Sequence, residues 1–570
     1  MAKMNCELNG IRSAPFGPLG LVTWATVLAF GWVLPNRYWP WSSFQTDYWI
    51  AACFAVGFLV VLIGSRRRMA WHGIAVFAVF LACVPLVQCG LGIVYFAGDA
   101  WLTALFLLGF ALAAVVGARW ELLQKDQAVD GLFLAIGMAA VCSVGMQLCQ
   151  WLGLDILGIW LMPGSSARPY ANFAQPNNLA TFLLWGIVAC AWGYSRRVLR
   201  GPFAMLATVF LVLGIALTQS RTGLVGLLVL VGLSFYWRRI GGTPNLFHAS
   251  LFLLGFFVLV FVFSPIISDV LLLDKTSRFL DAESALHDDA RLKLYEIFFS
   301  ASLDRPWFGY GWSNLGEAFY SRVDSYPELG VVFFHSHNLF LDLILWVGWP
   351  IGLLCIGALI VWLIKAFRAV DSIEKGILFS FVCVVGWHAM VEFPLHYANF
   401  LLPCGFVMGV IDSKRRPNGL LKTLIWPAVV VYLAAISLLV AVGIDYFRVE
   451  DNVRALRFER ANIETKQPRN APELLVMTQL QAFLQFSRIE PRAGLTENEL
   501  RWVRRAAIVI NNPFNTLRFI EMLALNGSEG EARLWVKKMQ KTLPAPAYKA
   551  MSNDWALDAK KNPALLSVAW

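Results

Sequence analysis

Apolar runs of roughly 20 residues recur along the first three quarters of the chain, and each is long enough to cross a bilayer as an α-helix. Of the 570 residues, 58% are hydrophobic and only 15% are charged, whereas a soluble domain carries about a quarter charged residues. The runs are continuous rather than alternating, which argues against strands. The sequence therefore predicts an all-α, polytopic membrane helix bundle.

The apolar runs predict thirteen membrane spans. They lie at about 19–35, 48–64, 71–95, 100–117, 130–153, 177–194, 202–218, 223–237, 247–265, 338–364, 376–393, 398–412 and 424–444. A large loop at about 266–337 separates the ninth and tenth spans. We therefore expect a transmembrane domain at 1–444, which includes this loop, and a separate helical domain at 445–570.

The distribution of basic residues predicts the orientation. Alternate short loops, starting after the second span, hold seventeen Lys and Arg, and the opposite loops hold three, Arg37, Arg168 and Arg221. Loops rich in Lys and Arg are cytoplasmic, so the first set is predicted to face the cytoplasm, together with the N-terminus and its Lys3 and Arg12. An odd number of spans then places the large loop and the tail outside. The net charge of +10 is explained by this topology and does not require a nucleic-acid partner.

The tail and the cysteines limit the remaining possibilities. The stretch at 511–544 is similar to a tetratricopeptide-type helix pair, and a small helical cap is the alternative interpretation. Of the ten cysteines, one is in the N-terminal tail and the others lie in apolar runs, so no disulfide framework is predicted. No Cys/His cluster has zinc spacing, and we expect neither a metal nor a cofactor.

Three arginines are predicted to face the exterior. Arg168 lies in "SSARPYANFAQPNNLATFL", Arg221 lies in "TQSRTGL" between two spans, and Arg291 lies in the large loop. An arginine close to hydrocarbon is costly unless it snorkels or has an anionic partner. Guanidinium groups bind phosphate oxygens bidentately, so this cluster would bind a lipid-linked diphosphate. Structural ion pairs with loop carboxylates are the alternative, above all for Arg291.

Two histidines open the tenth span in "FFHSHNLFLDLILWVGWPIG", namely His335 and His337, and Asn338 follows. A single histidine at a helix start is usually a polar anchor. Two histidines within three residues, on the same predicted side as the arginines, favour a catalytic role, because a neutral imidazole is a suitable proton acceptor near neutral pH.

Two further polar stretches lie on the predicted outer side. "NFAQPNNLA" holds Asn172, Gln175, Asn177 and Asn178, whose amides could bind sugar hydroxyls, while Asn177 or Asn178 could equally cap the helix. "MVEFPLHYANFLLP" holds Glu392, His396 and Tyr397 around Pro394, which should break the helix. Glu392 could pair with an arginine or orient a histidine, or this stretch could be a polar turn only.

These residues carry a resemblance to a family. "HNLFLDLILWVG" is similar to the histidine signature of the O-antigen ligase and polymerase superfamily, with nine residues between Asn338 and Gly348. The ligase pattern expects Gly, Thr or Tyr where this chain has Ile351. "RPYANFAQPNNLATFL", "QSRTGL" and "EFPLHYANFLLP" resemble the bacterial O-linked oligosaccharyltransferases (PglL-type), and the helical tail fits that branch.

The resemblance implies a GT-C-like glycosyltransferase of the bacterial inner membrane, with its active site at the periplasmic face. It implies metal-independent, inverting transfer of a glycan from undecaprenyl diphosphate to Ser or Thr of an exported protein such as a pilin. His337 would be catalytic, and Arg168, Arg221 and Arg291 would bind the diphosphate. Asn338, His335, Gln175, Asn177, Glu392, His396 and Tyr397 would support them.

Two rival functions remain at this point. The same chemistry could serve another acceptor, either the lipid A core or a second glycan chain. A transporter of the lipid-linked glycan belongs to a different class, but transporters place charged residues at mid-membrane and often show inverted repeats. We find no convincing repeat, and the ionisable residues gather at one predicted face.

Overall fold

The computed structural model describes residues 16–35, 39–65, 68–164, 167–238, 244–271, 282–464, 470–509 and 513–570. Lys3, Arg12 and Arg37, together with three of the seventeen basic loop residues, lie outside these ranges. The chain divides into two compact units, which are described separately. Unit 1 comprises Met1–Leu81, Phe106–Ser284 and Leu359–Ser437, and unit 2 comprises Ala82–Leu105, Ala285–Ala358 and Leu438–Trp570.

Each of the thirteen predicted spans coincides with a helix. These are α2 (Pro18–Val33), α3 (Phe44–Ile63), α4 (Gly73–Gly90), α5 (Ala97–Leu123), α6 (Gln127–Trp151), α7 (Pro176–Ser195), α8 (Gly201–Leu217), α9 (Arg221–Trp237), α10 (Pro244–Val270), α13 (Leu339–Arg368), α14 (Ile373–His388), α15 (Ala398–Arg415) and α16 (Trp426–Arg460). In the described ranges, eight are long and apolar enough to cross a membrane, namely α3 to α7, α10, α13 and α16, and α2, α8 and α9 are shorter apolar helices. The helices are confirmed, and the number of them that cross a bilayer stays a prediction.

Shorter elements complete the described chain. The predicted large loop contains α11 (Ala282–Asp304) and α12 (Leu315–Arg322), and the tail contains α17 (Thr478–Phe486), α18 (Glu497–Val509), α19 (Pro513–Leu525), α20 (Glu529–Thr542) and α21 (Ala545–Lys561). Four 3₁₀ turns are η1 (Gly158–Trp160), η2 (Val323–Ser325), η3 (Pro394–His396) and η4 (Pro563–Ser567). Strands β1 (Arg68–Trp71) and β2 (Leu421–Leu424) pair antiparallel, with Arg68 opposite Leu424.

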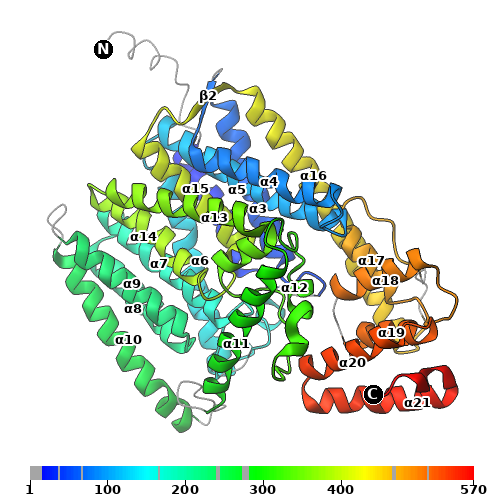
Figure 1. Cartoon of the computed structure of the whole chain (residues 1–570). Helices are drawn as coiled ribbons and strands as arrows, with labels where there is room; N and C mark the ends of the chain where they lie inside the picture. The colour runs from blue at the N-terminus through cyan, green and yellow to red at the C-terminus, as the bar shows by residue number, and fades with distance from the viewer. Residues whose placement is uncertain are drawn as a thin grey trace. The chain divides into compact units, whose positions relative to one another are not determined.

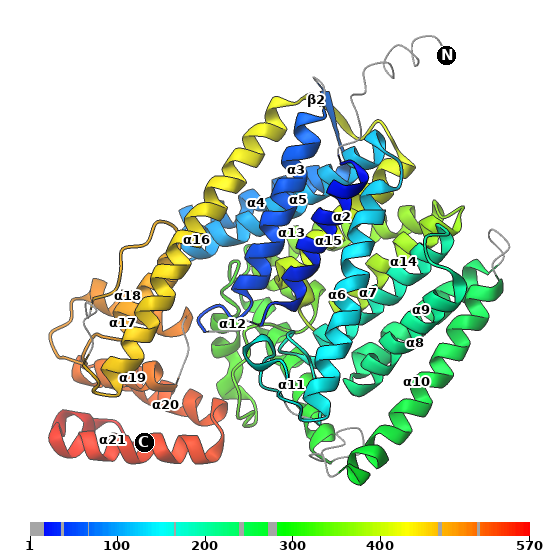
Figure 2. The ribbon, with the colours of Figure 1, turned by 180° about the vertical axis from the view of Figure 1, so that it is seen from behind.

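Unit 1 is a helix bundle in which α7 is central. It packs against α6, α8, α9 and α14. Helices α7, α8, α9, α10 and α14 lie side by side in cyan to green, and α10 is the outermost of them in both views (Figure 1, Figure 2). This packing buries most of α7, and its continuous apolar sequence is compatible with that burial.

Glycines allow α5 and α15 to touch backbone to backbone in unit 1. A Cβ atom added to Gly409 would overlap the carbonyl oxygen of Ala114, and one added to Gly117 would overlap that of Phe406. Small residues at helix crossings are the usual basis of close packing in membranes, where lipid offers no hydrophobic drive for association. The two glycines therefore fix the α5–α15 crossing.

An ion network ties four helix ends of unit 1 together, those of α5, α6, α7 and α15. The Lys414 ammonium lies 2.7 Å from a carboxylate oxygen of Glu121 and 2.7 Å from one of Asp126. Arg196 adds a contact of 2.9 Å to Asp126. The Lys414 side chain is only 12% exposed and its two partners are 5% and 7% exposed, so each charge depends on the others for compensation.

In unit 2, α13 is broken where a continuous span was predicted. Gly348 has φ 81° and ψ 168°, a conformation essentially restricted to glycine. Pro350 follows and has no N–H to donate to the preceding turn. A Cβ atom on Gly348 would overlap the backbone of Trp307 and lie 2.8 Å from the nitrogen of Phe308. The break therefore leaves room for a second chain segment to touch the helix axis.

The segment at 306–312 fills this break. Its backbone bonds to the broken helix are Tyr310 N–H to Leu345 C=O (2.7 Å), Gly311 N–H to Trp346 C=O (3.2 Å) and Trp349 N–H to Pro306 C=O (2.7 Å). The Gln88 amide adds a bond of 2.8 Å to the Trp346 carbonyl and accepts from Trp312 N–H at 3.2 Å. These bonds satisfy groups that the helix break would otherwise leave without partners.

The tail of unit 2 begins on α16, which continues to Arg460, well past the predicted end of the last span at 444. The buried Asp445 carboxylate accepts the backbone N–H groups of Leu475, Val476 and Met477 at 2.7–3.0 Å. Helices α19 and α20 pack on each other where the helix pair was predicted, and their tetratricopeptide character stays a prediction. On α19, burial raises the pKa of Glu521 to about 7, with a smaller contribution from Asp558.

Candidate catalytic and donor-binding residues

The predicted site residues fall into two sets, one in each unit. Unit 1 holds Arg168, Gln175, Asn177, Arg221, Glu392, His396 and Tyr397, and unit 2 holds Arg291, His335, His337 and Asn338. Each set is described on its own. The prediction that the arginines surround His337 stays a prediction.

Asn177 is the centre of the polar set in unit 1. Its amide nitrogen donates to a carboxylate oxygen of Glu392 at 3.2 Å, and its amide oxygen accepts from the Ser220 hydroxyl at 2.7 Å. The Ser220 hydroxyl in turn accepts the Gly223 N–H at 3.0 Å and so caps α9. Asn177 therefore links the start of α7, the start of α9 and the segment after α14.

Arg168 and Arg221 both lie at the connection between the end of α8 and the start of α9. The Arg168 Nε–H donates to the carbonyl of Thr218 at 3.3 Å, and Arg221 is the first residue of α9, directly after the capping Ser220. The positive end of a helix dipole and its N–H groups favour an anion at this position. In unit 1 the structure thus brings two of the three predicted arginines to one helix start.

Glu392, His396 and Tyr397 lie in the turn between α14 and α15. Helix α14 ends at His388 rather than at the predicted 393, six residues before Pro394, so the proline is not what ends this helix; it opens the turn η3. Glu392 is 4% exposed and holds the Asn177 amide. The His396 ring lies 5.7 Å from the Phe393 ring, and the Tyr397 backbone begins α15.

His388 is a member of this region that the sequence analysis missed. It is fully buried, and its Nδ1 lies 2.9 Å from the hydroxyl of Thr181 on α7. Its carbonyl accepts the N–H of Glu392. The signal that could have found it is its position four residues before Glu392, which places the two at helical spacing.

The segment that leads into α7 is held by side chains from elsewhere in unit 1. Gln175 is the backbone N-cap of α7 and Pro176 follows, so the alternative that Asn177 or Asn178 caps the helix is wrong. The side chain of Asn172 is held by backbone groups. Its amide nitrogen donates to the carbonyls of Val33 and Trp160, and its amide oxygen accepts the Met162 N–H.

Two alanines in that segment are strained. Ala171 and Ala174 have φ of 51° and 60°, values that are uncommon outside glycine. The amide oxygen of Gln150 accepts the N–H groups of Tyr170 and Ala171 at 3.0 and 2.7 Å. Backbone strain that surrounding contacts hold in place is a pointer to function, and here it lies between Arg168 and Gln175.

In unit 2, Asn338 fixes the start of α13. Its side-chain oxygen accepts the N–H groups of Phe340 and Leu341 at 3.0 and 3.2 Å. Ser336, which is buried, bonds through its hydroxyl to the Asn338 carbonyl at 3.1 Å. Asn338 is therefore a helix cap, and this structural role accounts for its place after His337.

His337 sits at the top of this turn with φ 60°. The left-handed conformation costs free energy for a residue with a Cβ atom, and the neighbouring bonds of Ser336 and Asn338 hold it. The half-buried His337 ring packs edge-on against Phe333, with 5.9 Å between ring centroids. The turn thus presents one imidazole in a fixed position, and it is the residue that the sequence predicted to be catalytic.

Asp342, a second residue that the sequence analysis did not single out, supports this turn. It is 1% exposed, and its carboxylate accepts the Ser336 N–H at 2.8 Å. The carboxylate lies within 4.8 Å of a His335 ring nitrogen and interacts electrostatically with His337. A carboxylate beside an imidazole stabilises the imidazolium that forms when the ring takes a proton. Arg291 lies on α11, away from this turn in sequence and half-buried.

Three family models match the chain. "O-Antigen ligase" matches residues 206–357, "Virulence factor membrane-bound polymerase, C-terminal" matches 377–557, and "Protein glycosylation ligase" matches 169–192. The first range contains Arg221, His335 and His337, and the third contains Gln175 and Asn177. Arg168 lies one residue before the third range.

Two curated relatives come from Acinetobacter baylyi. A general O-oligosaccharyltransferase is 28% identical over 535 residues, which cover 92% of this chain and 92% of the relative. A ComP-specific O-oligosaccharyltransferase is 25% identical over 412 residues, which cover 70% of this chain and 72% of the relative. The similarity to the first of these extends from the helix bundle into the tail.

Proposed function

The chain belongs to the protein O-oligosaccharyltransferases of the O-antigen ligase superfamily, and we propose that it glycosylates Ser or Thr of an exported protein such as a pilin. The proposed donor is a glycan on undecaprenyl diphosphate, and the proposed site faces the periplasm. The observation that carries the proposal is His337, held in a left-handed turn by Ser336, Asn338 and Asp342.

The proposed reaction is a single displacement with inversion. The acceptor oxygen attacks the anomeric carbon, and the bond from this carbon to the phosphate oxygen breaks, with its electron pair leaving on the diphosphate. His337 takes the hydroxyl proton as general base, because an alcohol is a weak nucleophile until its proton is removed. Asp342, which interacts electrostatically with His337, would stabilise the imidazolium that results.

The leaving group gains negative charge as the bond breaks. Arg168 and Arg221, at the start of α9, are proposed to neutralise it through charge-assisted hydrogen bonds, and Arg291 is proposed to assist them. Because these guanidinium groups supply the positive charge, the proposed mechanism is metal-independent, and a chelator should leave the rate unchanged.

Replacing His337 tests the base. We expect His337→Ala to lose transfer to an acceptor protein by about 10²- to 10⁴-fold, the usual contribution of a general base, while the variant still binds the donor. His248→Ala, on α10 and outside both sets, is the matched control. Full activity of His337→Ala would refute the role.

Substitutions of Asn338 distinguish its role as a helix cap from a role in the transfer reaction. Asp is as good an N-cap as Asn, so Asn338→Asp should keep both the fold and most of the activity, whereas Asn338→Ala should lower the melting temperature. If Asn338→Asp folds normally and is inactive, the side chain has a role in the reaction beyond the cap.

The polymerase match at 377–557 favours a second candidate, in which the acceptor is another glycan chain. Purified protein should be incubated with one donor and three acceptors in parallel, namely a pilin, the lipid A core and a second lipid-linked glycan. A glycosylated pilin supports the proposal, and a product only on lipid A core or glycan contradicts it. Donor that crosses vesicles without any product would indicate a transporter.

A further inference from the structure

A cavity of about 300 Å³ lies within unit 1, between α7, α8, α9, α10 and α14. Its lining comes from the last turns of α7 and α9 and the first turns of α8, α10 and α14. Asn177 and Arg221 lie at the opposite ends of α7 and α9. Because a helix rises 1.5 Å per residue, Cys190 in the cavity wall is roughly 20 Å along α7 from Asn177, so the cavity is separate from the candidate donor site.

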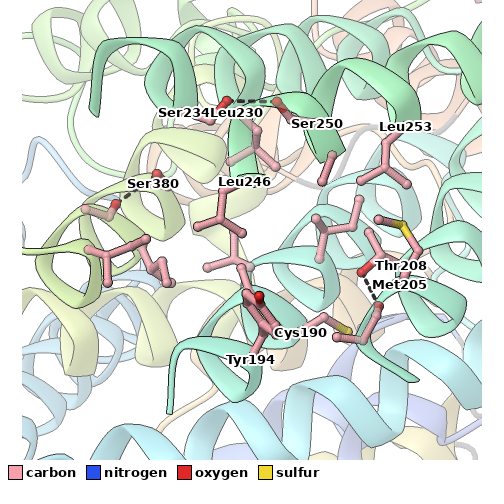
Figure 3. Close-up of a pocket in the computed structure, with 18 of the residues that line it drawn as sticks. Cys190, Tyr194, Met205, Thr208, Leu230, Ser234, Leu246, Ser250, Leu253 and Ser380 are labelled. Carbon is pink, nitrogen blue, oxygen red and sulfur yellow. Dashed lines mark hydrogen bonds between the residues drawn. The ribbon is translucent and has the colours of Figure 1, made fainter. Parts of the chain in front are cut away.

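The cavity wall is apolar in its chemistry. Leu230, Leu246 and Leu253 lie around the same space as Tyr194 and Met205 (Figure 3). A space of this size, lined in this way, falls at the lower end of the range for small-molecule sites.

The serine and threonine hydroxyl groups in the wall are already satisfied by the protein. Thr208 donates to the Ala204 carbonyl at 2.7 Å, and Ser380 donates to the Gly376 carbonyl at 2.9 Å. Ser234 and Ser250 lie 2.8 Å apart across α9 and α10, as the dashed line in Figure 3 shows. Apart from the Tyr194 hydroxyl, the wall therefore requires no polar group from an occupant, and a hydrocarbon chain meets that requirement.

The residues that flank the lining in sequence, in contrast, are basic, and we call them the rim. Arg200 directly precedes the lining residue Gly201, and Arg197 is three residues earlier in the same exposed turn. Arg238 follows the lining residue Trp237, and its guanidinium lies 4.1 Å from the centroid of the Phe235 ring. The described residues place no carboxylate within ion-pair distance of Arg197 or Arg200.

In the described chain the neighbouring acidic residues form no ion pair with Arg197 or Arg200, although Glu374 follows the lining residue Ile373 on α14. Arg196 already binds Asp126 and Asp130, and Asp371, just before α14, binds Lys375 at 2.7 Å. Three arginines thus stand beside an apolar cavity at the helix ends that the basic-residue count assigns to the cytoplasm. Basic pockets between transmembrane helices on that side attract the head groups of anionic lipids.

We propose that this cavity binds an acyl chain of an anionic phospholipid, with the lipid phosphate on Arg197 and Arg200. The acyl chain displaces no polar contact, and the head group supplies the negative charge that the rim lacks. This site is independent of glycan transfer, so its test does not depend on the proposed function.

Native mass spectrometry of the purified full chain in detergent, titrated with phosphatidylglycerol and with phosphatidylcholine of the same chains, tests the proposal. Wild type should retain phosphatidylglycerol more tightly. The double variant Arg197→Gln, Arg200→Gln should bind it roughly 10- to 30-fold more weakly, with phosphatidylcholine unchanged. Arg416→Gln, an exposed arginine away from the cavity, is the control.

Filling the cavity tests the acyl chain. Ala204→Phe should abolish retention of both lipids, and Thr208→Val, which keeps the volume of the wall residue, should not. If Ala204→Phe fails to fold, Ala249→Leu fills the cavity from α10 instead. Equal affinity of wild type for the two lipids, unchanged retention in a folded filled variant, or tighter binding of undecaprenyl phosphate than of phosphatidylglycerol would overturn the proposal.

Discussion

Gly348 is the position where one added methyl group should cost the most. Gly348→Ala forces an alanine into a conformation that is essentially glycine-only, at a cost of about 1–3 kcal/mol, and its Cβ atom would overlap the backbone of Trp307. Relief of this overlap moves the segment at 306–312 away and disrupts its three backbone bonds to α13, each worth about 1 kcal/mol. The expected loss is therefore about 4–6 kcal/mol.

Gly357→Ala is the matched control on the same helix. A Cβ atom there has no neighbour within 4 Å, and alanine is favoured over glycine in a helix by about 1 kcal/mol. Thermal unfolding of both variants in one detergent should give a lower midpoint for Gly348→Ala by many degrees and an equal or higher midpoint for Gly357→Ala. If the two variants melt within about 1 °C of each other, the account of the helix break is wrong.

Three further perturbations follow from the fold. Lys414→Met leaves its two buried carboxylate partners facing each other, so we expect a loss of about 3–5 kcal/mol, seen as a lower melting midpoint. Gly409→Ala should destabilise the α5–α15 crossing by about 1–3 kcal/mol, whereas Gly386→Ala, with nothing within 4 Å, should not. Glu521, with its pKa raised to about 7, binds a proton when folded that the unfolded chain releases above pH 4.5, so its contribution to stability falls between pH 4.5 and 7. Glu521→Gln should therefore slow proteolysis of the tail at pH 8 and have little effect at pH 5; equal protection at both values would contradict the shift.

The helices could be predicted because each is encoded locally. An apolar run of about 20 residues has few alternatives to a helix in a bilayer, and the thirteen runs all coincide with helices. Polar sequence after 444 was interpreted as the start of a new domain, yet α16 continues to Arg460. Helix ends depend on tertiary contacts such as those of Asp445, which no local pattern encodes.

Most residues of the candidate site could be named from the sequence, but the hydrogen bonds between them could not. The sequence analysis named Asn177 and Glu392, but the hydrogen bond between them joins positions 215 residues apart. The left-handed φ of His337 is held by bonds between Ser336 and Asn338, and Ser336 in turn binds Asp342. The sequence analysis singled out neither Ser336 nor Asp342. The break of α13 at Gly348 was missed because the hydrogen bonds that compensate for it come from the distant segment at 306–312.

The two hydrogen bonds of Asn177 determine whether aspartate, which has the same shape, can replace it. Its side chain donates in one direction, to Glu392, and accepts in the other, from Ser220. Aspartate has the same shape but offers oxygen on both sides, so Asn177→Asp would set two carboxylates against each other. At this junction of three helices, molecular shape is thus insufficient, and only the polarity of an amide distinguishes the native residue from its isostere.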